Sequence, residues 1–234
     1  MKKSLLPVLV FTAISITLTN CNITNKGTTP PVSGFFFVHA SADAPNFDVF
    51  ASGSVVAYNF PYKADTGYFI VNPQTFEFKV APTGTTNYVL TNIVPLSADT
   101  YYSLFLVDSL KKIKLVSVRD RIIVPGSDSA AVRFLQFSPN TPYLTAQLQN
   151  STDTLKFTGR TFNDQVSDTT RSTFKPLKAG TYSLALYLMG SGTPFISFQN
   201  ISLVSGKDYS VYLSGFYEGT GAQALDKSII QHTR

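Results

Sequence analysis

Two stretches of this chain, about 100 residues apart, carry the same pattern of residues. Three pairs of segments align, at offsets of 97, 106 and 108 residues: FFFVHASADAPNFDVF (35–50) with RFLQFSPNTPYLTAQ (133–147), TFEFKVAPTG (75–84) with TYSLALYLMG (181–190), and NIVPLSADTYYSLFLV (92–107) with NISLVSGKDYSVYLSG (200–215). A period of this length corresponds to a whole domain, because solenoid repeats run to only about 20 to 50 residues. The sequence therefore predicts two similar domains in tandem.

Each copy consists of short runs of strand-forming residues separated by turn residues. The first copy holds seven such runs, at 35–40, 47–51, 67–71, 75–81, 88–94, 101–107 and 112–118. In the run at 75–81 the apolar side chains of Phe76, Phe78 and Val80 alternate with Glu77 and Lys79, which is the period of a half-buried strand. No segment of helix length has a 3.6-residue period. We expect an all-β fold of two tandem immunoglobulin-like β-sandwich domains.

The N-terminus has the pattern of an export signal. Lys2 and Lys3 precede an apolar run at 5–18, which is shorter than the ~20 residues of a membrane span and fits the core of a signal peptide. Leu18-Thr19-Asn20-Cys21 then resembles the bacterial lipobox, although Asn20 departs from the usual Gly, Ala or Ser. Cys21 is the only cysteine of the chain. We predict cleavage before Cys21 and lipidation of its thiol.

These features divide the chain into four parts. They are a lipoprotein signal peptide at 1–20, a flexible spacer at 21–34, one β-sandwich at 35–124 and a second at 125–234 that includes a short C-terminal tail. The breaker residues Val124-Pro125-Gly126-Ser127 mark the junction between the sandwiches. The expected location is the cell envelope, as an outer-membrane lipoprotein on the periplasmic face or the cell surface, held to the membrane through Cys21.

The charge of the chain argues against a nucleic-acid partner. Loss of Lys2 and Lys3 with the leader leaves 17 basic and 14 acidic residues, and the basic ones are dispersed. A nucleic-acid-binding domain carries a clustered basic patch instead.

One motif of the first copy resembles a known family. The stretch VHASADAPNFDVF is similar to the V-x-H-A-S-P-D-A-P-x-V-D-V signature of a bacterial family called domain of unknown function 4397, and the stretch from Pro176 to Leu184 resembles a central strand of that family. The resemblance extends over about residues 35 to 220. It implies export, a β-sandwich fold and tandem copies. The name of the family does not assign an activity. In the second copy Gln136 replaces His39, and Asn140 replaces Asp43.

The same motif gathers residues of the kinds that catalytic sites use: His39, Ser41, Asp43 and Asp48. A hydrolytic triad needs an aimed nucleophile, an oriented base and an oxyanion hole, and no nucleophile elbow of the G-x-S-x-G kind is present. We therefore interpret these residues, with Pro45, as a loop-organising motif in which short polar side chains bond the backbone. We predict no catalytic residues and no enzyme activity.

Metal and cofactor sites also lack candidates. The chain has only two histidines, so zinc or copper would be short of ligands. Calcium prefers several carboxylates, and Asp43, Asp48 and Asp65 do not form a D-x-D-x-D-G run. We expect neither a metal nor a cofactor.

Exposed aromatic residues would mark a binding surface. Two groups of adjacent aromatic residues are candidates, Phe35-Phe36-Phe37 and Tyr101-Tyr102, because one of two neighbouring strand residues points outward. Their rings could instead cover the core and the seam between the sandwiches. We expect a non-enzymatic envelope lipoprotein that presents sandwich surfaces to a glycan or a protein partner. A hydrolase-type enzyme and a purely structural spacer are the alternatives.

Four sites fit the Asp-Ser/Thr-apolar pattern of O-glycosylation in exported Bacteroidota proteins. The acceptors would be Ser109, Ser129, Thr154 and Thr169. Asp-Ser and Asp-Thr pairs also form good turns, so the pattern has a second explanation.

Overall fold

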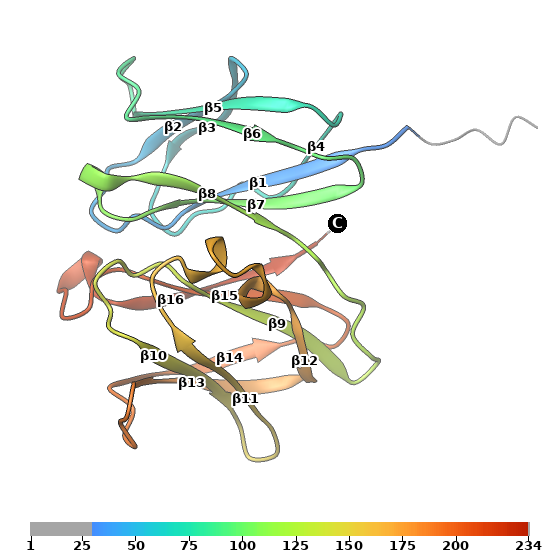
Figure 1. Ribbon diagram of the computed structural model, residues 1–234, viewed down its shortest axis with the longest axis vertical. Helices are drawn as coiled ribbons and strands as arrows, with labels where there is room; N and C mark the ends of the chain where they lie inside the picture. The colour runs from blue at the N-terminus through green and yellow to red at the C-terminus, as the bar shows by residue number, and fades with distance from the viewer. Residues whose placement is uncertain (1–29, 234) are drawn as a thin grey trace, which may run out of the picture. The chain divides into compact units, whose positions relative to one another are not determined.

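The computed structural model describes residues 30–233, and strands are the main regular structure of this range (Figure 1). The strands of the N-terminal half are β1 (Ser33–His39), β2 (Phe47–Ala51), β3 (Ser54–Phe60), β4 (Phe69–Val71), β5 (Thr75–Pro82), β6 (Leu90–Pro95), β7 (Thr100–Val107) and β8 (Lys114–Arg119). Those of the C-terminal half are β9 (Ser129–Gln136), β10 (Leu144–Gln149), β11 (Thr154–Arg160), β12 (Lys175–Lys178), β13 (Gly180–Leu188), β14 (Ile196–Leu203), β15 (Asp208–Ser214) and β16 (Asp226–His232). Four one-turn 3-10 helices complete the described part: η1 (Leu110–Lys112), η2 (Asp164–Val166), η3 (Thr169–Ser172) and η4 (Gly221–Gln223).

The predicted signal peptide, Cys21 and most of the predicted spacer lie outside the described residues. Within residues 30–233 no helix has the length and hydropathy needed to cross a membrane.

The strands form four sheets that pair into two sandwiches. The first sandwich consists of the sheets β4-β1-β7-β8 and β3-β2-β5-β6, and the second consists of β12-β9-β15-β16 and β11-β10-β13-β14. Each strand of the first therefore has a counterpart eight strands later in the same sheet position. In both sandwiches the first strand also runs parallel to the seventh, as β1 does to β7 and β9 to β15. The expected all-β fold of two tandem β-sandwiches is confirmed.

The register of the sheets corrects one of the repeat alignments. In the first sandwich Gly34 pairs with Tyr101, and in the second Ala131 pairs with Asp208, so the last strands correspond at an offset of 107 residues. The offset of 108 expected from the sequence is wrong by one residue. Such a slip moves every side chain of a strand to the opposite face.

A pair of tyrosines supports the corrected register. At an offset of 107 Tyr102 corresponds to Tyr209, and each hydroxyl accepts a hydrogen bond from a backbone N–H five residues upstream, Ser97 at 3.3 Å and Val204 at 3.0 Å. A tyrosine that bonds back across the corner before its strand is a feature of immunoglobulin-like sandwiches.

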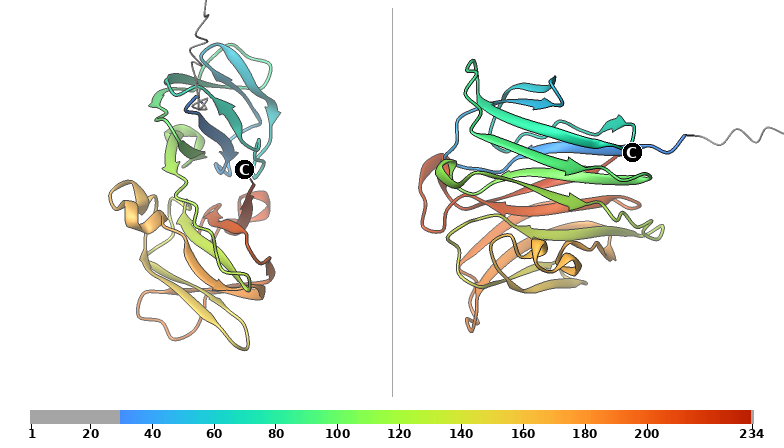
Figure 2. Two further views of the ribbon diagram at one scale, coloured as in Figure 1. Left: turned by 90° about the vertical axis from the view of Figure 1, so that its right-hand side faces the viewer. Right: turned by 45° about the horizontal axis from the view of Figure 1, so that its top comes forward.

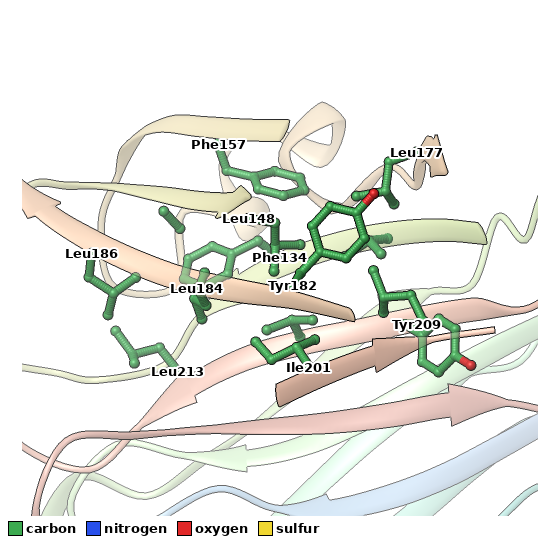
Figure 3. Close-up of a cluster of buried hydrophobic side chains, with 14 of the residues drawn as sticks. Phe134, Leu148, Phe157, Leu177, Tyr182, Leu184, Leu186, Ile201, Tyr209 and Leu213 are labelled. Carbon is green, nitrogen blue, oxygen red and sulfur yellow. The ribbon is translucent and has the colours of Figure 1, made fainter. Parts of the chain in front are cut away.

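Each sandwich encloses its own apolar core. The first is rich in phenylalanine, with Phe35, Phe37, Phe47 and Phe78 all buried. In the second, side chains of both sheets point toward one another, among them Phe134 of β9 and Tyr182 and Leu184 of β13 (Figure 3). These positions are the alternate apolar residues of their strands, so the period-2 pattern decides which face is buried.

A third apolar core joins the two sandwiches. The outer face of the sheet β4-β1-β7-β8 packs on the outer face of β12-β9-β15-β16, and the ring centroids of Phe105 and Phe137 lie 4.7 Å apart. Both views in Figure 2 show these sheets side by side. β1, β9 and β15 are consequently covered on both faces, as parallel strands usually are. This explains the Phe35-Phe36-Phe37 run, because Phe36 fills the interface while its two neighbours fill the core of the first sandwich.

A buried polar network crosses the same interface. Arg133 is fully buried and donates to Asp120 Oδ1 at 2.6 Å, to Ser103 Oγ at 2.8 Å and to Ser210 Oγ at 2.6 Å. Its guanidinium also lies 4.7 Å from the ring centroid of Phe174. Asp120 belongs to the segment after β8, so this ion pair connects the first sandwich to the second.

The predicted strands differ from the observed ones mainly at the edges. The run at 67–71 shortens to β4, and the run at 112–118 begins with η1 before β8. The sequence pattern did not predict β3, an edge strand whose pairing with β2 is interrupted by two register shifts. A bulged strand loses the simple alternation on which the prediction depends.

Candidate functional site

The His39 motif forms the corner between β1 and β2. His39 is fully buried, its ring stacks on Phe47 at 5.0 Å, and its Nε2 lies 3.1 Å from the carbonyl oxygen of Pro45. Its Nδ1 accepts from the N–H of Ser41 at 3.4 Å. Since the carbonyl can only accept and the N–H can only donate, the neutral ring with its proton on Nε2 satisfies both partners. Burial lowers the pKa of His39 below its ordinary 6.5, against the smaller raising effect of the Pro45 carbonyl.

The two aspartates of the motif bond backbone groups of other loops. Asp43 Oδ1 accepts from the N–H of Leu110 at 2.8 Å, which ties the β1–β2 corner to η1. Asp48 accepts from the N–H groups of Asn59 at 2.9 Å and Gly84 at 3.0 Å, and these two bonds lower the pKa of its carboxyl. The carboxylates point to different loops, so this motif does not converge on a substrate.

A serine–histidine pair occurs elsewhere, in the interface between the sandwiches. Ser210 Oγ lies 2.7 Å from His232 Nε2, and His232 Nδ1 lies 2.9 Å from the hydroxyl of Tyr68, which donates to Asp120 Oδ2. Ser210 is fully buried and its oxygen accepts from Arg133 Nε. A nucleophile needs access to a substrate, so this arrangement is a packing network. In the part of the chain that the structure covers, no three His, Asp or Glu side chains are grouped to hold a metal ion.

The four predicted glycosylation acceptors all lie at the boundary of a strand or a 3-10 helix. Thr154 and Thr169 are exposed, whereas Ser109 and Ser129 are half-buried. In each case the preceding aspartate accepts a hydrogen bond from one of the next two residues, as Asp153 Oδ1 does from the N–H of Thr154 at 2.8 Å. The turn-forming role of these pairs is thus visible, and modification of the hydroxyls stays a prediction.

A groove lies on the outer face of the second sandwich, across β11, β10 and β13. Its volume is about 470 Å³, and its floor carries the outward side chains of Thr145, Gln147, Lys156, Thr158 and Tyr187. Leu188, the last residue of β13, and residues 189–192 of the β13–β14 loop form one wall. We call this feature the outer groove.

The sheet register brings the floor of the outer groove together. Thr145 of β10 pairs with Tyr187 of β13, and Gln147 of β10 pairs with Lys156 of β11. Residues paired across strands have their side chains on the same face, about 5 Å apart at Cβ. One aromatic ring is thereby placed among two hydroxyls, an amide and an ammonium group.

The wall of the outer groove is fixed by a tight turn. The N–H of Ser191 donates to the carbonyl of Leu188 at 3.0 Å, and Gly190 has φ +82° at the third position of this turn. A type II turn requires positive φ at that position, which favours glycine. The N–H of Met189 also donates to the carbonyl of Tyr143 at 3.0 Å, so the loop is anchored to the residue that precedes β10.

A larger hollow, of about 560 Å³, lies at the open side of the first sandwich. Its lining includes Phe35, Val55, Phe69, Ile70 and Phe76, with Ser52, Ser54, Asn72 and Gln74 at its polar parts. This apolar cleft is the space between the edge strands β3 and β4, where the two sheets separate and part of the core reaches the surface.

No residue of the outer groove was predicted from the sequence. The predicted binding surfaces were pairs or runs of adjacent aromatic residues, whereas Tyr187 is a single ring in the stretch ALYL of β13. The signal that could have found it is the outward position of Tyr187, one residue after the buried Leu186. Tyr102, by contrast, packs against the core of the first sandwich, and Tyr101 packs on Tyr68 with ring centroids 5.4 Å apart.

Residues 34–147 match the family model described as Domain of unknown function (DUF4397). This stretch resembles that family. The match begins in β1 and ends in β10, so it contains the whole first sandwich with the His39 motif and the beginning of the second. The expected resemblance to this family is confirmed over residues 34–147, and its extension to about residue 220 stays a prediction. No curated protein matches the chain.

Several solved structures show distant likeness. A family 26 carbohydrate-binding module of Eubacterium rectale, solved with maltoheptaose, has a TM-score of 0.24 at 8% identity over 87% of this chain and 98% of its own. A streptococcal virulence factor described as binding alpha-glucan has a TM-score of 0.23 at 11% identity over 77% and 92%. A leucine-rich repeat protein of Bacteroides thetaiotaomicron has a TM-score of 0.19 at 13% identity over 80% and 26%. At these TM-scores the likenesses say nothing about the ligand of this chain.

Proposed function

We propose that this protein is a non-catalytic binding module of the cell envelope and that it holds a glycan chain in the outer groove. The observation that carries this proposal is the composition of the groove floor, where the ring of Tyr187 lies among hydroxyl, amide and ammonium groups. Sugars present apolar C–H faces and a rim of hydroxyls. The negative face of an aromatic ring attracts such C–H groups, and the polar side chains bond the hydroxyls.

The rigidity of the outer groove supports the same proposal. Its floor consists of strand residues, which the sheet holds in place, and its wall is a turn closed by backbone hydrogen bonds. A rigid site loses little conformational entropy when a ligand binds. A surface that serves only as a spacer has no need of such a floor.

The test is binding of the full chain to soluble polysaccharides in native gels, with Tyr187→Ala as the variant. We expect the variant to bind about tenfold more weakly, which corresponds to ~1.4 kcal/mol and is typical for the loss of one stacked ring. Tyr88→Ala is the matched control, because Tyr88 is 50% exposed and belongs to the first sandwich. Equal retardation of both variants, or no retardation by any polysaccharide, would refute the proposal.

A protein partner is the second candidate, and the apolar cleft is the observation that favours it. β4 is an edge strand of three residues, and Ile70 is 57% exposed beside the cleft. An extended segment of a partner can pair with such an edge and place an apolar side chain in the space behind it. Loss of partner binding in Ile70→Asp with glycan binding intact would establish this second site.

We also propose that the module is attached to the outer membrane through lipid on Cys21. The lipobox-like sequence before a lone cysteine supports this, and two acyl signals anchor a protein stably where one does not. In Cys21→Ala the protein should leave the membrane fraction or accumulate as the uncleaved precursor. Normal cleavage together with unchanged membrane association would contradict the anchor.

Glycosylation of the protein itself is a separate proposal. Thr154 and Thr169 are the more accessible of the four acceptors, because both are exposed. Mass spectrometry of the protein from its native cell should show hexose-type mass additions on peptides that contain these residues. Unmodified peptides at all four acceptors would leave only the turn-forming role.

A further inference from the structure

The outer groove carries a single kind of charge. Lys156 is the one charged residue of its lining, it is exposed, and within residues 30–233 its ammonium group forms no ion pair. Salt bridges occupy other lysines of the chain, such as Lys63 with Asp226 and Lys114 with Asp108. Lys156 is therefore available to a ligand.

A second, basic hollow adjoins the outer groove on the other side of β11. It has a volume of about 220 Å³ and shares the exposed Thr158 with the groove. Its lining includes Arg160, Arg171 and Lys175 and only one carboxylate, that of Asp168. The two hollows together form a path that passes over the edge strand.

The charges along this path do not balance. Arg160 is buried and holds Asp164 through both carboxylate oxygens, at 2.7 Å each, and Arg171 contacts both Asp164 and Asp168. Lys156 and Lys175 therefore remain as the surplus of four cations over two carboxylates. Lys175 is exposed, and its ammonium group lies 5.2 Å from the ring centroid of Phe157 with no ion pair in the described part of the chain.

We infer that the ligand of the outer groove is an acidic glycan, whose carboxylate or sulfate groups lie against Lys156 and, beyond Thr158, against Lys175. This inference rests on the proposed glycan-binding function. Hydroxyls of a neutral glycan can accept hydrogen bonds from the two ammonium groups. Only an acidic glycan adds the Coulomb attraction between opposite charges to these hydrogen bonds. Because both lysines are exposed, salt screens the attraction, with a Debye length of about 10 Å at 0.1 M.

The experiment compares charged and uncharged forms of the same polymers on the full chain. The probes are polygalacturonate against its methyl ester, and dextran sulfate against dextran. We expect at least one charged polymer to bind more than tenfold tighter than its neutral form, with the two pairs distinguishing a carboxylate ligand from a sulfate ligand. The affinity should fall as the salt concentration rises from about 0.05 M to 0.5 M.

Charge-removing variants locate the contact. Lys156→Gln and Lys175→Gln should each weaken binding of the charged polymer about three- to tenfold, whereas Lys111→Gln, at an exposed lysine of the first sandwich, should leave it unchanged. Equal losses in all three variants would mean attraction to the overall basic charge and would overturn the inference. Equal, Tyr187-dependent affinity for charged and neutral polymers would also overturn it while leaving glycan binding intact. If no polymer binds, the proposed function fails with it.

Discussion

Ser41 and Ser138 occupy equivalent positions after the first strand of each sandwich, yet their hydroxyls have different surroundings. Ser138 Oγ accepts from Thr141 Oγ1 at 2.6 Å. Ala44 stands at the position of Thr141 in the first copy, and within residues 30–233 the buried Ser41 Oγ has no hydrogen-bond partner. A buried hydroxyl without a partner destabilises the folded state. Removing a hydroxyl that has a partner destabilises it too, because the partner is then left without a hydrogen bond.

The serine pair gives a matched prediction. Ser138→Ala should lower the free energy of unfolding by about 1 to 2 kcal/mol, because Thr141 loses its partner, and Ser41→Ala should be neutral or stabilising. Chemical denaturation of the two variants beside the unchanged chain measures both effects. Equal destabilisation by the two substitutions would show that Ser41 has a partner after all.

His39 gives a pH dependence with a definite sign. Its pKa is lowered in the folded chain, so between the ordinary value of 6.5 and the folded value the unfolded chain binds a proton that the folded chain does not. His39 should therefore cost stability as the pH falls below about 6.5, by at most ~1.4 kcal/mol per pH unit. The second copy carries Gln136 at this position, so His39→Gln is the natural comparison. Denaturation between about pH 7 and pH 5 should show a shallower loss of stability in the variant than in the unchanged chain, and identical slopes would contradict this assignment.

Among the strands, the alternation of apolar and polar residues predicted those that are regularly paired and failed for those with an irregular pairing. Runs such as 75–81 were found because Phe76, Phe78 and Val80 face one core. β3 was not predicted because two register shifts in its pairing with β2 disturb the two-residue period of a regular strand. The loop-organising role of Asp43 and Asp48 was predictable from the sequence, because both carboxylates do accept hydrogen bonds from backbone N–H groups of loops. The outer groove was not predictable, because its lining depends on which strands are neighbours. The order β11-β10-β13-β14 does not follow from the hydrophobic pattern of the sequence.

The tyrosine corners are elements whose contribution can be measured. Tyr209 accepts from the N–H of Val204 and donates to Gln231 Oε1 at 3.1 Å, so Tyr209→Phe removes two hydrogen bonds and should lower the free energy of unfolding by about 1 to 3 kcal/mol. Tyr58→Phe is the control, because Tyr58 is 70% exposed and its loss of a hydroxyl should change nothing. If Tyr209→Phe behaved like the control, the corner would contribute nothing to the fold.

At the scale of the described molecule, the two sandwiches share a buried interface. Its apolar core and the Arg133–Asp120 pair both require the two halves together. One interpretation of the Phe35-Phe36-Phe37 run was that its rings cover the seam between the sandwiches, and Phe36 does lie in the interface core. The sequence did not show how far this third core extends. β1 and most of β9 carry apolar residues on both faces, but a strand that is buried on both faces cannot be told from any other apolar run by its period alone.

The interface predicts cooperative unfolding. Arg133→Met should lower the free energy of unfolding by about 3 to 5 kcal/mol, because Asp120 is left as a buried charge without its partner, and adding Asp120→Asn should recover part of that loss. Both sandwiches should unfold in one transition in guanidinium chloride. Two separated transitions in the unchanged chain would mean that the sandwiches are independent.

The central claim, that the outer groove is the ligand site, is tested most directly by residue-resolved NMR during titration with an acidic oligosaccharide. The amide signals of Lys156, Thr158, Tyr187 and Gly190 should move together and saturate, while those of the first sandwich, such as Tyr88, stay in place. Shifts centred on the apolar cleft at Val55 and Ile70, or spread over lysines of both sandwiches without saturation, would contradict the assignment of the groove.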